Sequence, residues 1–316
     1  MSNDEEVTMS VVDLPLEAIA EELLRLDPDG SRWGSVIRHT FDMIYNGQET
    51  GRYKWDELMK TEKTHFGSLF EINAQREFSF EGGAKLDFFI EGYEVDAKWS
   101  QSMGGWMLPP EVFDQIALVG TADDAESRWS IGLVRVSEVN RRDKTNRDQK
   151  SQLSLTGRAA IKWLWREAQL PPNVLLQLPE DVVTHILDST KGTQRLHRLF
   201  RAAEGRIVHR TTVATVARQL DAQKRVRGNG GSRSVLASEG IVILSGKYHA
   251  HIAKALAVPV PSATEYISVR VVPSTDGSGA IIAGERWRRA KADDVVVKDA
   301  PQLPERGTVE ELDEEV

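Results

Sequence analysis

The 316-residue sequence contains no cysteine, so disulfide bonds and cysteine-based metal sites are excluded. The absence of cysteine also fits a cytoplasmic setting. No stretch approaches the roughly 18 consecutive apolar residues that a membrane helix needs. The start of the chain, MSNDEEVTMS, lacks the basic beginning and apolar stretch of a secretory signal. We therefore expect a cytoplasmic protein with no membrane partner.

Several common catalytic signatures are also missing. The sequence has neither a G-x-S-x-G elbow nor a G-x-x-x-x-G-K-[ST] phosphate loop. The run GNGG at 228–231 is therefore interpreted as a turn or a backbone contact with phosphate. His249 and His251 have a spacing that can suit a metal, but no third ligand lies nearby, and we interpret them as surface residues.

Acidic residues are scarce between residues 191 and 233, where eleven Lys and Arg stand against Glu204 and Asp221. The net charge of −8 comes from the two ends: residues 1–29 carry −8 and residues 299–316 carry −6, which leaves the interior at +6. A basic interior is typical of proteins that bind phosphate, although a solvated helical face can also be basic. This distribution favours a nucleic-acid partner.

The length allows two domains, each with its own core. Helical spacing predicts helices over 14–26, 33–45, 64–78 and 155–167. Between them, a tight turn at Glu91-Gly92 joins two alternating runs over 86–99 into a β-hairpin, and further strands are predicted at 115–120 and 129–136. Together these elements predict an α/β domain with a mixed sheet over residues 10–168.

A Pro-containing linker is predicted at 169–175, where the sequence reads LPPN over 170–173. The following residues, 176–300, have helices first, at 179–187, 194–203 and 211–220, and strands afterwards, at 241–244, 266–272 and 280–287. This is the element order of an α+β winged helix-turn-helix domain, in which 211–220 has the length of a helix-turn-helix element. The acidic tail, 301–316, is expected to be disordered.

The stretch GYEVDAKW at 92–99 contains the candidate chemistry. Side chains alternate along a strand, so Asp96 and Lys98 project from the same side. The hairpin's other strand carries Asp87, and Glu71 lies on the preceding helix, beside the stripe Phe66, Leu69, Ile72, Asn73 and Arg76. Carboxylates on rigid elements can hold Mg²⁺, and a lysine beside them can orient water for hydrolysis of a phosphodiester.

A plainer interpretation stays open on spacing alone. Asp87, Asp96 and Lys98 can form cross-strand ion pairs on a solvated face, each contributing about 0.2–1 kcal/mol. The D-x-K spacing is weak by itself, because Asp148-Gln149-Lys150 repeats it in a charged loop without any strand pattern. An acid beside a helical stripe, such as Glu71, is usually a surface residue.

Three longer stretches add a family resemblance. They are GQETGRYKWDELMKTEKTHFGSLFEINAQREFSF, YEVDAKWSQSMGGWMLPPE and KRVRGNGGSRSVLASEGIVIL. They closely resemble the NaeI family of type IIE restriction endonucleases, over about residues 26–272. The resemblance implies a restriction-endonuclease-like core of the PD-(D/E)xK class and a C-terminal helix-turn-helix domain of the catabolite activator type.

In that family both domains bind double-stranded DNA, one cleaving a site and the other holding a second copy as an activator. The resemblance implies Glu71, Asp87, Asp96 and Lys98 as the catalytic set. Asp87 and Asp96 would hold Mg²⁺, Glu71 would assist the metal site, and Lys98 would position the attacking water. Leu86, where the motif name has proline, departs from the family pattern without affecting the chemistry.

The resemblance further implies a homodimer that cuts the palindrome GCCGGC to blunt ends, and a cognate DNA methyltransferase in the same cell. In the second domain we expect basic side chains to contact DNA: Arg218, Lys224, Arg225, Arg227 and Arg233. The alternative is a DNA-binding transcriptional regulator without enzymatic activity, whose first domain only dimerises.

Overall fold

The structure is a computed structural model that describes residues 12–228 and 230–304. The chain forms two compact units. The first comprises the described residues up to Ile44 together with Met59–Pro171, and the second comprises Tyr45–Leu58 and the described residues from Pro172 onward. Of the tail that is expected to be disordered, only residues 301–304 fall within the described part.

The first unit is built on one mixed five-stranded sheet in the order β1-β2-β3-β4-β5. Only β2 and β3 run parallel; the other neighbours are antiparallel. The strands are β1 (Phe88–Ile90), β2 (Tyr93–Trp99), β3 (Ile116–Asp123), β4 (Arg128–Arg135) and β5 (Lys162–Gln169). The helices are α1 (Leu14–Leu26), α2 (Ser31–Tyr45), α4 (Lys60–Phe78), α5 (Leu155–Ala159) and the 3₁₀ turn η2 (Pro110–Val112). The predicted α/β class with a mixed sheet is confirmed.

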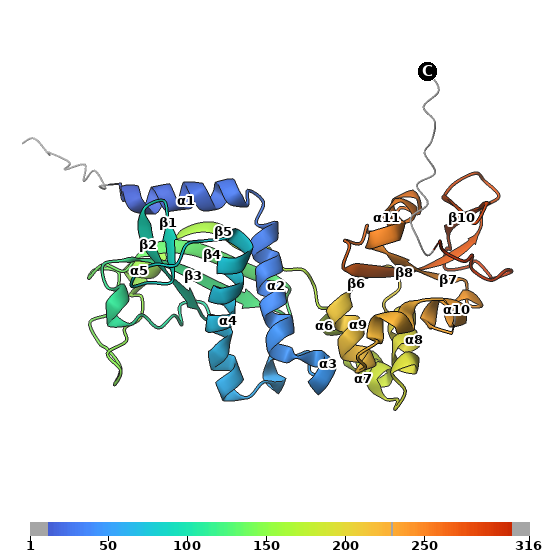
Figure 1. The fold of residues 1–316 in the computed structure, drawn as a ribbon, viewed down its shortest axis with the longest axis horizontal. Helices are drawn as coiled ribbons and strands as arrows, with labels where there is room; N and C mark the ends of the chain where they lie inside the picture. The colour runs from blue at the N-terminus through green and yellow to red at the C-terminus, as the bar shows by residue number, and fades with distance from the viewer. Residues whose placement is uncertain (1–11, 229, 305–316) are drawn as a thin grey trace, which may run out of the picture. The chain divides into compact units, whose positions relative to one another are not determined.

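Helices α2 and α4 lie side by side across one face of this sheet (Figure 1). Phe41 of α2 meets Phe66 of α4 with 4.7 Å between ring centroids, and Phe70 of α4 meets Trp99 of β2 at 4.9 Å. All three phenylalanines are fully buried, and aromatic side chains of this size dominate the energetics of a core. The packing fixes α4 against the strand that carries Asp96 and Lys98.

The opposite face is covered by irregular chain. The segment between β2 and β3 buries Trp106, whose Nε1 donates a hydrogen bond to the carbonyl of Gly120 on β3. After β4, residues 141–153 fold back on themselves, and we call them the basic hairpin. It is anchored by bridges between Arg141 and Leu153 and between Leu108 and Ser151. Both segments contribute to one apolar cluster on this face: Trp106, Leu108, Val112, Ala117, Val119, Val134, Val136, Leu153 and Ile161.

The predicted helix over 155–167 is wrong beyond Ala159. Residues Lys162–Gln169 form β5, and its pairing with β4 contains a register shift between Ile131 and Gly132. Because of this bulge, Trp163 packs toward Trp106 on one face while Trp165 packs toward Trp129 and Trp33 on the other. The break in alternation removed the period of two by which a strand is recognised.

The second unit contains short helices and a second sheet. Its helices are α3 (Gly47–Thr50), α6 (Val174–Gln177), α7 (Glu180–Leu187), α8 (Gly192–Ala202), α9 (Arg210–Ala217), α10 (Ser232–Ala237) and α11 (Gly246–Ala255), with 3₁₀ turns η1 (Trp55–Glu57) and η3 (Ala222–Val226). Its strands are β6 (Ile207–His209), β7 (Ile241–Ser245), β8 (Glu265–Pro273), β9 (Ala280–Ile282) and β10 (Glu285–Arg289).

The second sheet centres on β8, the longest strand, which pairs antiparallel with β6, β7 and β10. The run 280–287, predicted as one strand, is instead two strands, β9 and β10, joined at Ala283-Gly284. Both joining residues have positive φ, 51° and 80°, which turns the chain back on itself. No helix in residues 12–228 and 230–304 has the length and apolar character to cross a membrane.

The segment Tyr45–Leu58 leaves the first unit after α2 and packs into the second. Tyr53 belongs to the core cluster of the second unit and is only 8% exposed. The side-chain amide of Asn173 donates a 3.1 Å hydrogen bond to the Tyr53 carbonyl. Gly47 lies so close to Thr215 of α9 that a Cβ on Gly47 would overlap that side chain. The segment is therefore part of the second unit's core.

Candidate active site

Asp96 and Lys98 project from β2 toward the face covered by irregular chain. Their register partners on β3 are Ala117 and Val119, both members of the apolar cluster on that face. Lys98 Nζ lies 2.5 Å from Asp96 Oδ2 and also donates to the carbonyl of Ala97 at 3.2 Å. Asp96 is 4% exposed. The plainer interpretation required the pair to lie on a solvated face. The burial of Asp96 contradicts that interpretation.

Asp87 precedes β1 at the edge of the sheet. The ladder between β1 and β2 ends at Phe88 and Val95, and beyond it the Asp87 carboxylate accepts a 2.7 Å hydrogen bond from the backbone N–H of Ala97. This bond holds Asp87 beside the strand segment that carries Asp96 and Lys98. It uses one carboxylate oxygen of Asp87.

Glu71 lies on α4 and is half-buried. Its pKa is raised, first by burial and then by the charge of Asp87, while Lys98 lowers it. The predicted stripe on this helix is wrong in part, because Ile72 is 37% exposed and Arg76 is also exposed. The buried residues of α4 are Phe66, Phe70, Asn73, Ala74 and Phe78. Glu71 follows Phe70 and so lies at the margin of the buried face.

The pKa of Asp96 is raised to about 6, chiefly by burial and in smaller part by the charges of Asp87 and Glu111, against the lowering effect of Lys98. Glu111, in η2, is an acid that the sequence reasoning missed. It stands in a loop after two prolines, with no periodicity to mark it. The four expected residues and Glu111 thus form one electrostatic group, with Asp96 as its most buried member.

The donor set suits a hard divalent cation, since carboxylate oxygens are its preferred ligands. Asp96 Oδ2 is buried and has only Lys98 as a neighbour of opposite charge, and one oxygen of Asp87 accepts no hydrogen bond from the described residues. No three acids or histidines among the described residues form a ready-made metal cage. The fit is therefore to an ion such as Mg²⁺, which one or two carboxylates can hold while it keeps several waters.

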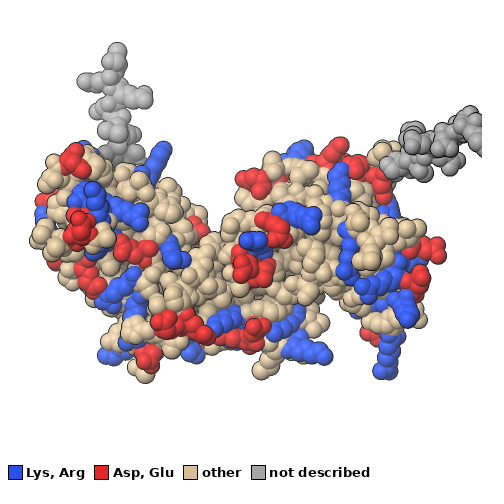
Figure 2. All heavy atoms as spheres, turned by 180° about the vertical axis from the view of Figure 1, so that it is seen from behind, with Lys and Arg blue, Asp and Glu red and all other residues tan. Residues whose placement is uncertain are grey.

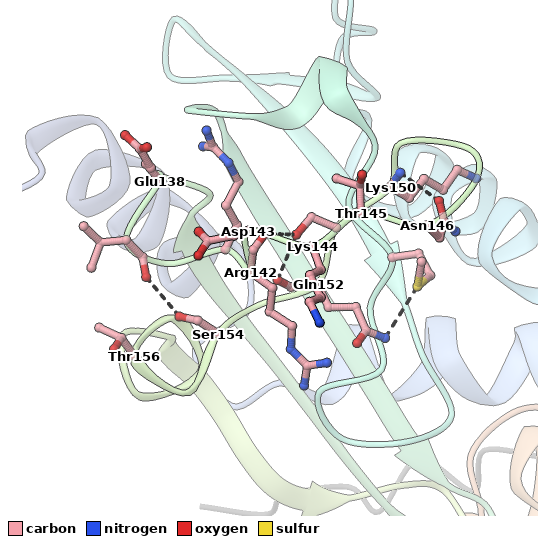
Figure 3. A pocket seen from close by; sticks show the side chains of 14 residues that line it. Glu138, Arg142, Asp143, Lys144, Thr145, Asn146, Lys150, Gln152, Ser154 and Thr156 are labelled. Carbon is pink, nitrogen blue, oxygen red and sulfur yellow. Dashed lines mark hydrogen bonds between the residues drawn. The ribbon is translucent and has the colours of Figure 1, made fainter.

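The second D-x-K sequence behaves as a surface loop. Asp148 and Lys150 lie in the basic hairpin, and the side-chain oxygen of Asn146 accepts hydrogen bonds from both of their backbone N–H groups. Figure 3 shows the cavity of about 930 Å³ that this hairpin lines, with acidic Glu138 and Asp143 beside basic Arg142, Lys144 and Lys150. Nothing there buries a carboxylate against a lysine.

The basic residues expected to contact DNA fall in two groups in the second unit. Arg218 ends α9, and its guanidinium packs beside Gly51, while Arg225 pairs with Asp221 at 2.9 Å. Lys224 is exposed on η3. By contrast, Arg227 and Arg233 line a common cavity.

The interpretation of His249 as a surface residue is wrong. Its ring is fully buried, Nδ1 accepts a 3.0 Å hydrogen bond from the N–H of Ser245, and Nε2 lies 2.9 Å from the carbonyl of Pro304. Burial lowers the pKa of His249 to about 4. Both ring nitrogens are occupied, so this histidine is a structural residue.

Over most of its length, this sequence is similar to known proteins. The profile of a family described as restriction endonuclease NaeI matches residues 17–298. The chain belongs to the NaeI restriction endonuclease family. A relative from Lentzea aerocolonigenes, the type II restriction enzyme NaeI, is 44% identical over 302 residues, which cover 92% of this chain and 95% of the relative. The resemblance seen in the sequence is confirmed, and this NaeI family member is a site-specific nuclease.

Replacing Asp96 by asparagine is expected to stabilise this NaeI family protein in metal-free buffer. The ionised carboxylate is disfavoured in the fold, since its pKa rises from 3.8 to about 6. At about 1.4 kcal/mol per pKa unit, the gain at pH 8 is at most about 3 kcal/mol. The penalty is complete above pH 6 and vanishes near pH 4, so the variant's advantage in urea unfolding disappears over that range. Asp148→Asn, on the exposed hairpin, is the control, and an unchanged midpoint for Asp96→Asn at pH 8 contradicts the expectation.

Proposed function

We propose that this protein is a type IIE restriction endonuclease that uses Mg²⁺ to cut both strands of a palindromic DNA site, GCCGGC, to blunt ends. The observation that carries the proposal is the ion pair of buried Asp96 with half-buried Lys98, beside Asp87 and Glu71. The name of the relative supports the reaction class, and the resemblance in sequence supports the site. Burial of the aspartate separates this D-x-K from the second one, since Asp96 is 4% exposed whereas Asp148 lies on the surface.

Each residue has a role that its position supports. Asp87 and Asp96 would hold the ion, and Glu71 would assist from α4. When bound, Mg²⁺ makes a coordinated water easier to deprotonate and offsets charge on the scissile phosphate. Lys98 Nζ is fixed between Asp96 and the Ala97 carbonyl, which places a rigid donor where it can orient the attacking water. Asp96 is 4% exposed, and this burial limits the water around its carboxylate.

We further propose that the second unit is a winged helix-turn-helix domain that binds a second copy of the site and thereby activates cleavage. In this assignment α9, η3 and α10 form the helix-turn-helix, and the β9-β10 hairpin forms the wing. Two-fold symmetric cleavage of a palindrome calls for a homodimer, and a restriction system calls for a methyltransferase that protects the host's own sites. The basic residues of 191–233 support a DNA partner.

Plasmid cleavage tests the proposal directly. Supercoiled plasmid with two GCCGGC sites is incubated with the protein, with Mg²⁺ or with EDTA. We expect linear products with blunt ends mapping to GCCGGC, and no cleavage in EDTA, because the carboxylate pair alone cannot activate water. Binding that ignores Mg²⁺, with no cleavage under any divalent ion, would establish the alternative of a non-enzymatic regulator.

A one-site duplex tests activation by the second unit. We expect slow cleavage of this duplex and faster cleavage when a cleavage-resistant duplex with the same site is added. Equal rates on one-site and two-site DNA, with no response to added duplex, contradict the two-site assignment while leaving the nuclease assignment intact.

A further inference from the structure

The second unit contains a cavity of about 370 Å³ whose charged lining is entirely basic. It lies where η3 and α10 approach the end of β7, the start of α11 and the start of β8. Arg210, Arg227, Arg233 and Lys247 supply its charges, and no acidic residue lines it. Its size is at the lower end of the range for small-ligand pockets, about 300–1,000 Å³.

The lack of acids distinguishes this cavity from other basic places in the molecule. Figure 2 shows Lys and Arg interspersed with Asp and Glu over the face that it draws. The larger cavity of Figure 3 likewise has Glu138 and Asp143 among its cations. Elsewhere in the second unit, Arg201 pairs with Glu239 at 2.6 Å and Arg225 with Asp221 at 2.9 Å. Each of these two arginines is neutralised by a carboxylate.

Three cations of the cavity have no such partner. The side chains of Arg210, Arg227 and Lys247 form no ion pair with any acid among residues 12–228 and 230–304. Arg233 is oriented by its Nε, which donates a 2.8 Å hydrogen bond to the carbonyl of Ile243. Like charges brought together without counter-charge repel one another and destabilise a fold. An anion in the cavity would remove that repulsion.

Polar groups complete the lining. The Tyr266 hydroxyl donates a 2.9 Å hydrogen bond to the side-chain oxygen of Gln223, and Ser245 and Thr264 add further hydroxyls. The pKa of Tyr266 is raised by burial and lowered by the charges of Arg233, Arg210 and Arg227, which line the same cavity. Guanidinium and ammonium groups that line one space together with the hydroxyls of Ser245 and Thr264 match the three or four acceptor oxygens of a phosphate.

We propose that this cavity binds a phosphate group, as a free phosphate or a phosphate ester. Its assignment to a backbone phosphate of the second DNA site rests on the proposed function, whereas binding of the free anion does not. Arg227 and Arg233 were expected to contact DNA from the sequence. Arg210 and Lys247 join them only in the fold, because they come from the start of α9 and the start of α11.

Thermal unfolding of the full-length protein tests the site without DNA. Inorganic phosphate is compared with chloride at equal ionic strength. We expect phosphate to raise the melting temperature of the second unit well beyond chloride, and the double variant Arg210→Gln/Lys247→Gln to lose that difference. The control Lys254→Gln/Lys291→Gln removes two charges from the same unit outside the cavity and should keep it. Equal effects of phosphate and chloride on the wild-type protein overturn the proposal.

The salt dependence of duplex binding identifies the source of the phosphate. If the cavity holds one backbone phosphate, the slope of log affinity against log salt should fall in magnitude by about 0.9 in the cavity variant and stay unchanged in the Lys254→Gln/Lys291→Gln control. An unchanged slope, with phosphate stabilisation intact, assigns the cavity to a free phosphate ester and removes DNA as its ligand. If the wild-type protein does not cleave plasmid, the proposed function is refuted, but the phosphate result is unaffected.

Discussion

Replacing Lys98 with alanine is expected to lower the rate of DNA cleavage by about 10²–10³-fold or more. The lysine is the fixed cation of the site: Nζ lies 2.5 Å from Asp96 Oδ2 and donates to the Ala97 carbonyl. Its loss removes the group that we propose orients water and offsets negative charge in the transition state. Rates should be measured in single turnovers with saturating DNA and Mg²⁺, so that binding does not limit them.

The control for Lys98→Ala is Lys150→Ala, which removes the lysine of the D-x-K sequence in the basic hairpin. Lys150 is held only through the turn that Asn146 forms within the basic hairpin. We expect its cleavage rate to stay within a few-fold of wild type. Wild-type rates for Lys98→Ala, together with full Mg²⁺ dependence, would show that another group positions the water and would refute the assigned role.

A loss of activity through unfolding must be separated from a loss of chemistry. Removing Lys98 leaves the buried carboxylate of Asp96 without its cation, which is costly for a residue 4% exposed. Lys98→Ala should therefore be compared with the double variant Asp96→Asn/Lys98→Ala, which removes the unpaired charge. We expect the double variant to recover the unfolding midpoint and to remain inactive.

Much of the site could be predicted because its signals are local. The alternation of YEVDAKW and the turn at Glu91-Gly92 predicted the strand and hairpin, which put Asp87, Asp96 and Lys98 at neighbouring positions of one sheet. Local spacing cannot show what covers a strand. The apolar cluster on the face of Asp96 takes residues from the segment between β2 and β3 and also Leu153 from the basic hairpin, which is distant in sequence. Burial on this face raises the pKa of Asp96.

The sequence predictions that were wrong, for the buried stripe of α4 and for β5, failed because tertiary contacts decide the outcome. On α4 two helical stripes compete, and contacts with Trp33 and Trp99 select the one that contains Phe70 rather than Ile72. In β5 a bulge sends Trp163 and Trp165 to opposite faces, so the strand lost its period. In both elements, tertiary packing determines which side chains face the core, and it overrides the local sequence pattern.

Separating the second unit at the predicted linker is expected to destabilise it. The sequence predicts a domain boundary at residues 169–175, and a fragment that starts there would contain the whole predicted DNA-binding domain. In the structure that fragment lacks Tyr45–Leu58, and with it Tyr53, which fills the core beside Val174, Leu196 and other cluster members. It also leaves Asn173 without the backbone carbonyl of Tyr53. Removing this segment therefore leaves a gap in the core, which the removal of a surface loop would not.

A fragment of residues 172–316 is consequently expected to be unstable by several kcal/mol. Deleting one large buried aromatic side chain commonly costs about 3–5 kcal/mol, a large share of the stability of a small domain. Urea unfolding followed by circular dichroism should show a lower midpoint or no cooperative transition. Fusing residues 45–58 to the fragment through a flexible Gly/Ser linker should restore the transition, because it supplies Tyr53 and α3 again.

The matched control is the same fusion with Tyr53→Ala, which keeps the chain length and removes the aromatic anchor. We expect it to unfold close to the fragment without the segment. Equal midpoints for the bare fragment and the two fusions would show that Tyr45–Leu58 adds nothing to the core. Restoration by the intact segment alone would show that residues far apart in sequence build one folding unit. A helix-turn-helix function tested on the bare fragment would then be tested on a protein with an incomplete core.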